Sequence, residues 1–175
     1  LTKSFVKLDV VLEKVVEQIG NMYDRYKKGL PANLGIPSGF RDLDEIFTGF
    51  NPTDYIVIAA RPGMGKTSFA LTLANNITKD SDNAVAIFSL EMSNEQLLYR
   101  YFSMNSNIPL SQVKRGEMSD PIWKNALIKT DGMMGRNIWL DDDPYLTPRI
   151  LRTKLRKLLR EADIKVVFID YLQLM

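Results

Sequence analysis

The first thirty residues show a helical spacing of apolar side chains. Apolar residues recur every three or four positions from about residue 6 to residue 28, and charged residues fall largely on the other face. Gly29-Leu30-Pro31 follows and predicts the end of this amphipathic helix. The apolar stripe would either pack on the core of the same domain or dock on another subunit. It consists of Leu8, Val11, Leu12, Val15, Ile19, Met22, Tyr23 and Tyr26.

After residue 50, short continuous apolar runs alternate with helical patterns. The apolar runs predict four strands, at residues 56–60, 84–90, 138–140 and 166–169. Helices are predicted after the first run, from the capping box at 93–96, from Thr147-Pro148, and in shorter stretches at 43–46, 110–115 and 121–130. Continuous apolar strands that alternate with helices are typical of a parallel sheet flanked by helices, so the predicted fold class is α/β.

The first apolar run leads into a glycine-bearing turn and then into a helix. This order of elements, with Gly-Lys-Thr at the end of the turn, predicts a P-loop that binds a nucleoside triphosphate. Gly63 and Gly65 allow the backbone N–H groups to surround one anion, Lys66 can reach the β- and γ-phosphates, and the Thr67 hydroxyl can bind Mg²⁺. Ala60 stands where the usual pattern has its first glycine. The competing interpretation is a glycine-rich connector.

Composition narrows the chemistry further. The 175 residues suffice for one domain with a proper core, and the net charge of +2 is too small to indicate nucleic acid by itself. The chain has no Cys and no His, which excludes disulfides, Cys–His nucleophile pairs and zinc sites built from these residues. No apolar run approaches membrane-spanning length, and we expect a cytoplasmic protein. Both ends look cut, so we expect a piece of a longer protein.

Two acidic residues follow predicted strands and are candidates for catalysis. Asp170 ends the apolar run at 166–169 in the manner of a Walker B strand, and with Thr67 it could hold Mg²⁺. Glu91 follows the run at 84–90 and could act as the general base that polarises the attacking water. Because ligands of parallel sheets bind beyond the carboxyl ends of the strands, both residues are expected near the P-loop. The alternative for each is a solvated or structural carboxylate.

Two other charged stretches allow a functional and a structural interpretation. The run Asp141-Asp142-Asp143 could bind a metal, but a loop at a strand end before a proline turn is the preferred interpretation. The predicted helix after residue 147 is strongly basic, which indicates either a solvated face or a phosphate-binding or interface role. Its cations are Arg149, Arg152, Lys154, Arg156, Lys157 and Arg160.

These motifs resemble those of DnaB-type replicative DNA helicases. The resemblance lies in the P-loop segment 59–67, in the segment 88–93 around Glu91, in the segment 169–175 around Asp170, and in the lead-in at 35–44. It covers nearly the whole chain. The family's later strands, with a γ-phosphate-sensing Gln, an arginine finger and DNA-contacting loops, have no counterpart here, nor does its N-terminal primase-interacting domain.

The resemblance implies a RecA-like P-loop NTPase fold, with a linker helix and connector over residues 1–34 and an incomplete ATPase core over 35–175. It implies ATP and Mg²⁺ as cofactors and a homo-hexamer in which the first helix docks on the adjacent subunit. It also implies single-stranded DNA, a primase and a helicase loader as partners, and no membrane. Glu91, Lys66 and Arg100 are the implied catalytic residues, and Thr67 and Asp170 the implied metal ligands. The implied nucleotide-binding residues are Ala60, Arg61, Pro62, Gly63, Met64, Gly65, Lys66, Thr67 and Ser68.

Two other functions remain open from the residues. One is a RecA-like ATPase of the recombination or clock type. The other, for this piece alone, is a nucleotide-binding or assembly module without turnover.

Overall fold

The computed structural model describes residues 5–29 and 35–171. The chain forms two compact units, Leu1–Asn51 and Pro52–Met175, and each is described by itself. The boundary that the sequence predicts at residue 34 lies outside the described residues, as do Leu30 and Pro31 and the last four residues of the 169–175 segment.

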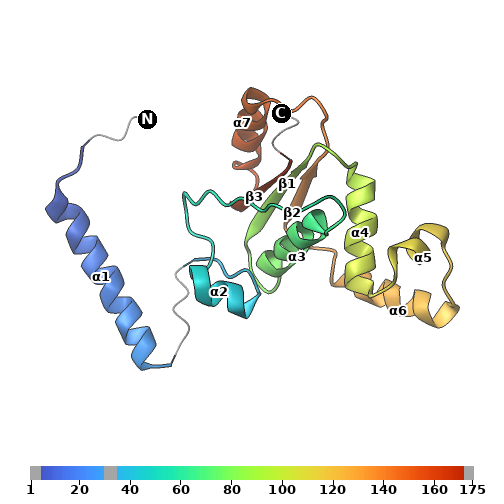
Figure 1. The fold of residues 1–175 in the computed structure, drawn as a ribbon, viewed down its shortest axis with the longest axis horizontal. Coiled ribbons are helices and arrows are strands. Elements are labelled where there is room, and N and C mark those ends of the chain that lie inside the picture. Colours follow the sequence, from blue (N-terminus) through green and yellow to red (C-terminus); the bar gives the residue numbers. More distant parts are fainter. Residues whose placement is uncertain (1–4, 30–34, 172–175) are drawn as a thin grey trace. The chain divides into compact units, whose positions relative to one another are not determined.

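The first unit begins with one long amphipathic helix, α1, at Leu8–Lys27 (Figure 1). The expectation of a helix from about 6 to 28 is confirmed. None of its residues is buried, and its apolar stripe is open, with Ile19 56% and Tyr23 55% exposed. In proteins, most of the stability of a helix comes from packing of its apolar face, so this stripe is a candidate contact surface.

A short lead-in completes the first unit. Helix α2 spans Arg41–Phe47, and its buried Asp44 accepts hydrogen bonds from the backbone N–H groups of Ser38 (2.8 Å) and Gly39 (3.2 Å). Gly35 lies against the backbone of Phe50, where a Cβ atom would not fit. The lead-in is therefore a compact turn whose glycine and aspartate are required by its geometry.

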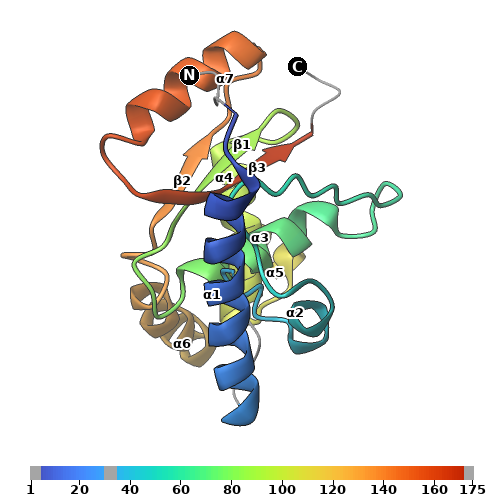
Figure 2. The ribbon, with the colours of Figure 1, turned by 90° about the vertical axis from the view of Figure 1, so that its left-hand side faces the viewer.

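The second unit contains a parallel sheet of three strands. Strand β1 spans Ala84–Ser89, β2 spans Ile138–Asp141 and β3 spans Ile164–Asp170. The order is β2-β1-β3, and both pairings are parallel, as Figure 2 shows with β1 in the middle. All residues of β1 are buried. The predicted α/β fold with a parallel sheet is confirmed.

Helices cover both faces of this sheet (Figure 1). Leu73 and Leu97 are 1% exposed and form the core on the α3–α4 side. Ala86 and Phe88 pack with the leucines of α7 on the other face, as expected from the alternation of side chains along a strand. The helices are α3 (Lys66–Thr78), α4 (Asn94–Ser106), α5 (Leu110–Arg115), α6 (Asp120–Asp131) and α7 (Pro148–Leu158).

The prediction of a strand at residues 56–60 is wrong. Residues 54–60 have no regular secondary structure, and Ile56 and Val57 are 49% and 70% exposed. An apolar run becomes a strand only when neighbouring backbone supplies hydrogen bonds, and β3 pairs only with β1 among the described residues. The P-loop therefore follows an extended, unpaired segment here.

The aspartate run pairs with one lysine of the basic helix. Lys154 of α7 lies 2.7 Å from Asp141 and 2.9 Å from Asp143, so both carboxylates are paired with a cation. No cluster of three or more acidic, His or Cys side chains able to hold a metal occurs within residues 5–29 and 35–171. The ion pairs with Lys154 support the preferred interpretation of the aspartate run as a structural loop. Lys154 is not part of a purely solvated face, whereas the arginines of α7 are exposed.

No helix in the described part of the chain is both long and apolar enough to span a bilayer.

Candidate active site

The P-loop connects the extended segment to α3. Gly63 and Gly65 have positive φ angles of 79° and 89°, and a Cβ atom added at either would meet no atom within 4 Å. The requirement for glycine is therefore conformational, and the loop is open on the side where a side chain would stand. Gly65 is the N-cap of α3, so the positive end of this helix faces the loop. This arrangement is suited to binding an anion such as a phosphate.

The first two residues of α3 both contact Asp170 at the end of β3. The Lys66 Nζ atom lies 2.8 Å from Asp170 Oδ1, and the Thr67 hydroxyl donates a hydrogen bond of 2.7 Å to Asp170 Oδ2. Asp170 is 8% exposed, so a charged partner is needed to offset its burial. Residues more than a hundred positions apart in sequence thus form one polar group, and Asp170 lies beside the P-loop as predicted.

Tyr171 adds a contact that the sequence did not indicate. The Lys66 Nζ atom lies 4.4 Å from the centroid of the Tyr171 ring, within the range of a cation–π interaction. Together with Asp170, this ring holds the lysine at the mouth of the P-loop. Only the position of Tyr171, directly after the Walker B aspartate, could have suggested this role.

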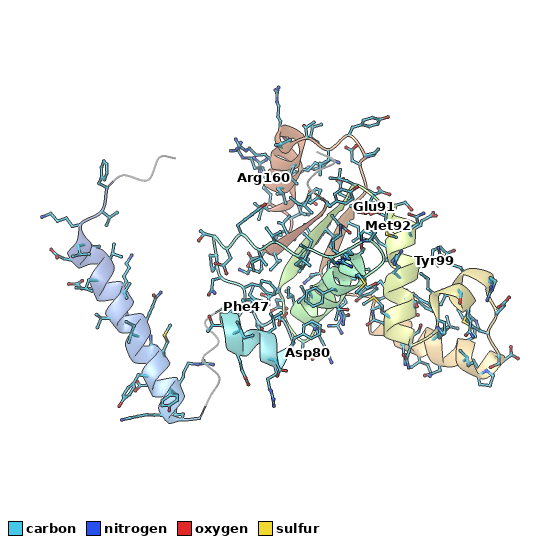
Figure 3. All side chains as sticks on the ribbon, viewed as in Figure 1. Phe47, Asp80, Glu91, Met92, Tyr99 and Arg160 are labelled. Carbon is cyan, nitrogen blue, oxygen red and sulfur yellow. The ribbon has the colours of Figure 1, made fainter. Side chains whose placement is uncertain are left out.

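Glu91 lies in the loop between β1 and α4, at the same end of the sheet (Figure 3). The register pairs Ser89 with Asp170, and the Leu90 N–H donates to the Asp170 carbonyl at 2.8 Å. The sheet therefore brings the Glu91 loop beside the end of β3. The Glu91 carboxylate is exposed. In the described part of the chain, no hydrogen bond or ion pair joins it to Lys66 or Asp170.

Arg100 lies on α4, in its second turn. Its Nε atom is buried and has no hydrogen-bond partner within the described residues. A buried donor without a partner is costly, and such atoms in native structures call for an explanation such as a ligand. The structure does not bring Arg100 into direct contact with the Lys66–Asp170 group.

The residues fit a hydrated magnesium ion bound with a nucleotide better than a metal centre made of protein alone. Mg²⁺ usually keeps several waters and takes one or two protein ligands plus substrate phosphates. Asp170 and Thr67 offer one carboxylate and one hydroxyl at the end of the P-loop, and the open glycine turn leaves space for the phosphates.

Comparisons with known proteins identify the family of this chain. The family model described as "DnaB-like helicase C terminal domain" matches residues 35–175. The chain is 36% identical over 173 residues to "Replicative DNA helicase DnaC" of Bacillus subtilis (strain 168), covering 99% of this chain and 37% of that protein. It is 39% identical over 140 residues to "Replicative DNA helicase DnaB" of Geobacillus stearothermophilus, covering 80% and 31%.

Solved structures show the same relationship. The chain matches a DnaB-like replicative helicase, solved to show its interactions with primase, with a TM-score of 0.81 and 30% identity. The match covers 98% of this chain and 40% of that one. A solved ATPase domain matches with a TM-score of 0.82, and this chain spans 59% of it. The chain thus spans about a third of the length of these curated relatives, and it belongs to the DnaB-like helicase C-terminal domain family.

Proposed function

We propose that the protein containing this chain is an ATP-dependent replicative DNA helicase, and that this chain supplies part of its ATPase domain. Hydrolysis of Mg-ATP at subunit interfaces would drive translocation along single-stranded DNA and unwinding of the duplex. The observation that carries this proposal is the meeting of Lys66, Thr67 and Asp170 at the mouth of a glycine-bearing loop. ATP-dependent strand displacement by the full-length protein tests it.

The P-loop residues 60–68 would bind the nucleotide. Lys66 would place its charge on the β- and γ-phosphates, and Thr67 and Asp170 would hold Mg²⁺, Asp170 through coordinated water. In the structure Lys66 and Thr67 are bonded to Asp170, so these contacts keep the binding groups oriented. The magnesium would neutralise charge on the phosphates.

Glu91 would act as the general base. A base must come within hydrogen-bond reach of the attacking water, and the loop of Glu91 is tied to the end of β3 beside Asp170. Its side chain is exposed and has no ion pair within the described residues, so its carboxylate is free to accept a proton. Arg100, with its buried unpaired Nε atom, would stabilise negative charge on the nucleotide.

The assembly would be a homo-hexamer that encloses single-stranded DNA, in contact with a primase and a helicase loader. One solved relative was described with primase, which supports this choice of partner. A replicative enzyme of this kind would act in the cytoplasm, in keeping with a chain that has no cysteine.

Helix α1 would dock on the neighbouring subunit of the ring. Its apolar stripe is exposed along the whole helix, with Val15 39% and Ile19 56% exposed, and needs a partner. Such a long amphipathic helix is suited to an apolar groove on a second copy.

Substitution of Val15 and Ile19 by aspartate is expected to convert the full-length hexamer to smaller species. The physical reason is that an unpaired charge placed in an apolar interface loses its hydration. Light scattering coupled to gel filtration measures the mass, and circular dichroism checks the fold. Reversal of charge at Lys14, which is exposed off the stripe, is the matched control and should leave the ring intact. A hexamer of unchanged stability in the double variant would contradict the docking.

A further inference from the structure

The loop between β2 and α7 is bonded to the first residue of α4. The Asp142 carboxylate accepts one hydrogen bond from the Asn94 backbone N–H at 2.8 Å and a second from Asn94 Nδ2 at 3.0 Å. These residues are 48 positions apart. Within the described residues the Asn94 Oδ1 atom is buried without a partner, so the side chain's polar contact is the one to Asp142.

Asp142 is itself held from both sides. Lys154 bonds to Asp141 (2.7 and 2.9 Å) and to Asp143 (2.9 Å), and the Asp143 N–H donates to the Asp141 carboxylate at 3.1 Å. The bond from Lys154 lowers the pKa of Asp143, and a further bond from the Tyr145 N–H acts in the same direction. Burial acts to lower the pKa of Lys154, but its bonds to both aspartates raise it. The ion pairs of the two neighbouring aspartates therefore restrict the position of Asp142.

The Glu91 loop runs from the end of β1 to Asn94. On the sheet side it is fixed by the Leu90–Asp170 backbone bond and by the Ser89 hydroxyl, which donates to the Met92 carbonyl at 2.7 Å and accepts from the Met92 N–H at 3.1 Å. At the start of α4, the Ser93 hydroxyl accepts from the Gln96 N–H, and the Gln96 side chain accepts from the Ser93 N–H. This capping box does not involve the Asn94 N–H, which needs a different acceptor. Asp142 is that acceptor.

We propose that Asp142 is a positioning residue for Glu91. It acts through Asn94, three residues beyond Glu91, by setting where α4 begins and therefore where the preceding loop can place the carboxylate. This inference rests on the proposed role of Glu91 as general base. Misplacement of a catalytic group by about 1 Å can reduce turnover up to about a hundredfold, so a remote contact of this kind can affect the rate.

If Asp142 only stabilised α4, its substitution would have a different effect from the loss of a positioning residue. A carboxylate at a helix N-terminus stabilises the helix, and its loss would lower stability whatever Glu91 does. The P-loop, however, leads into α3 and makes none of the contacts described for Asp142. A positioning role therefore predicts a loss of kcat with nucleotide affinity retained.

The test compares Asp142→Ala, Asp142→Asn and Asn94→Ala in the full-length protein. Asp142→Ala is expected to lower kcat for ATP by about tenfold while the Kd for Mg-ATP stays within about twofold. Asp142→Asn keeps an acceptor for the Asn94 N–H and should recover much of that loss. Asn94→Ala keeps the backbone bond, should cost less than Asp142→Ala, and should add nothing to it in the double variant.

Hydrogen exchange gives an independent readout. Peptides covering residues 90–96 should exchange faster in Asp142→Ala than in the wild type, while peptides covering the P-loop should not change. Asp120→Ala is the matched control, because Asp120 is an exposed aspartate in the first turn of α6 with no contact to this loop in the described residues. It should leave kcat and exchange unchanged.

Three outcomes would overturn the positioning role. They are an unchanged kcat in Asp142→Ala, an equal loss of kcat and affinity, and an Asp142→Asn variant as slow as Asp142→Ala. The proposed function is judged separately by Glu91→Gln: if that variant is slow while Asp142→Ala is normal, only the positioning role fails. If Glu91→Gln has the kcat of the wild type, Glu91 is not the general base.

Discussion

Replacement of Glu91 by glutamine is expected to lower kcat for ATP hydrolysis by the full-length protein about a hundredfold or more. Glutamine has nearly the same shape but cannot accept the proton of the attacking water. A hundredfold loss corresponds to about 2.7 kcal/mol of transition-state stabilisation. Because Glu91 lies in the β1–α4 loop and not in the P-loop, binding of Mg-ATP should be retained. Steady-state ATPase assays and calorimetric titration measure the two quantities.

Glu95→Gln is the matched control for this variant. Glu95 is an exposed glutamate in the first turn of α4, four residues from Glu91. Its replacement removes the same charge from the same region and should leave kcat within about twofold, as expected for an exposed surface change. Near-normal turnover in Glu91→Gln would place the base on another residue.

Replacement of Lys66 by alanine is expected to weaken Mg-ATP binding by about tenfold to a hundredfold. Hydrogen bonds to charged groups contribute about 1.5–3 kcal/mol, which corresponds to that range. The change also leaves the buried carboxylate of Asp170 without its cation, so the ligand for the metal loses its orientation. Calorimetric titration with a non-hydrolysable ATP analogue and Mg²⁺ measures the affinity.

Lys79→Ala is the control for Lys66, because Lys79 is an exposed lysine directly after the last residue of α3. It should bind the analogue as the wild type does. Unchanged affinity in Lys66→Ala, in a variant whose melting temperature is close to that of the wild type, would remove the assignment of the P-loop.

Local signals predicted the helices accurately. Thr147 is the N-cap of α7, and its side chain accepts from the Ile150 N–H, as a threonine followed by proline indicates. Ser93 and Gln96 form the expected capping box. The bounds of α5 agree with the predicted range of 110–115. These features depend on neighbours within one turn, which the sequence shows directly.

The run at 56–60 shows where local pattern is insufficient. Its apolar residues have the composition of a buried strand, but a strand also needs backbone partners from distant segments. In the structure this run is unpaired and Val57 is 70% exposed. Hydrophobicity alone does not reveal whether the partner is available.

The site was predictable to different degrees. The position of Asp170 at a strand end indicated that it would lie near the P-loop, and it contacts Lys66 and Thr67 there. The bonds of Asp142 to Asn94 and of Lys154 to Asp141 join segments whose register no local pattern sets. The Lys66–Tyr171 contact also depends on side-chain geometry at the end of β3.

The most direct test of the central claim is strand displacement by the full-length protein on a forked duplex with two single-stranded tails. We expect unwinding that requires both ATP and Mg²⁺ and that is lost in Glu91→Gln, although this variant still binds the nucleotide. Unwinding by Glu91→Gln at the wild-type rate, or a wild-type protein that hydrolyses ATP on DNA without separating the strands, would contradict it.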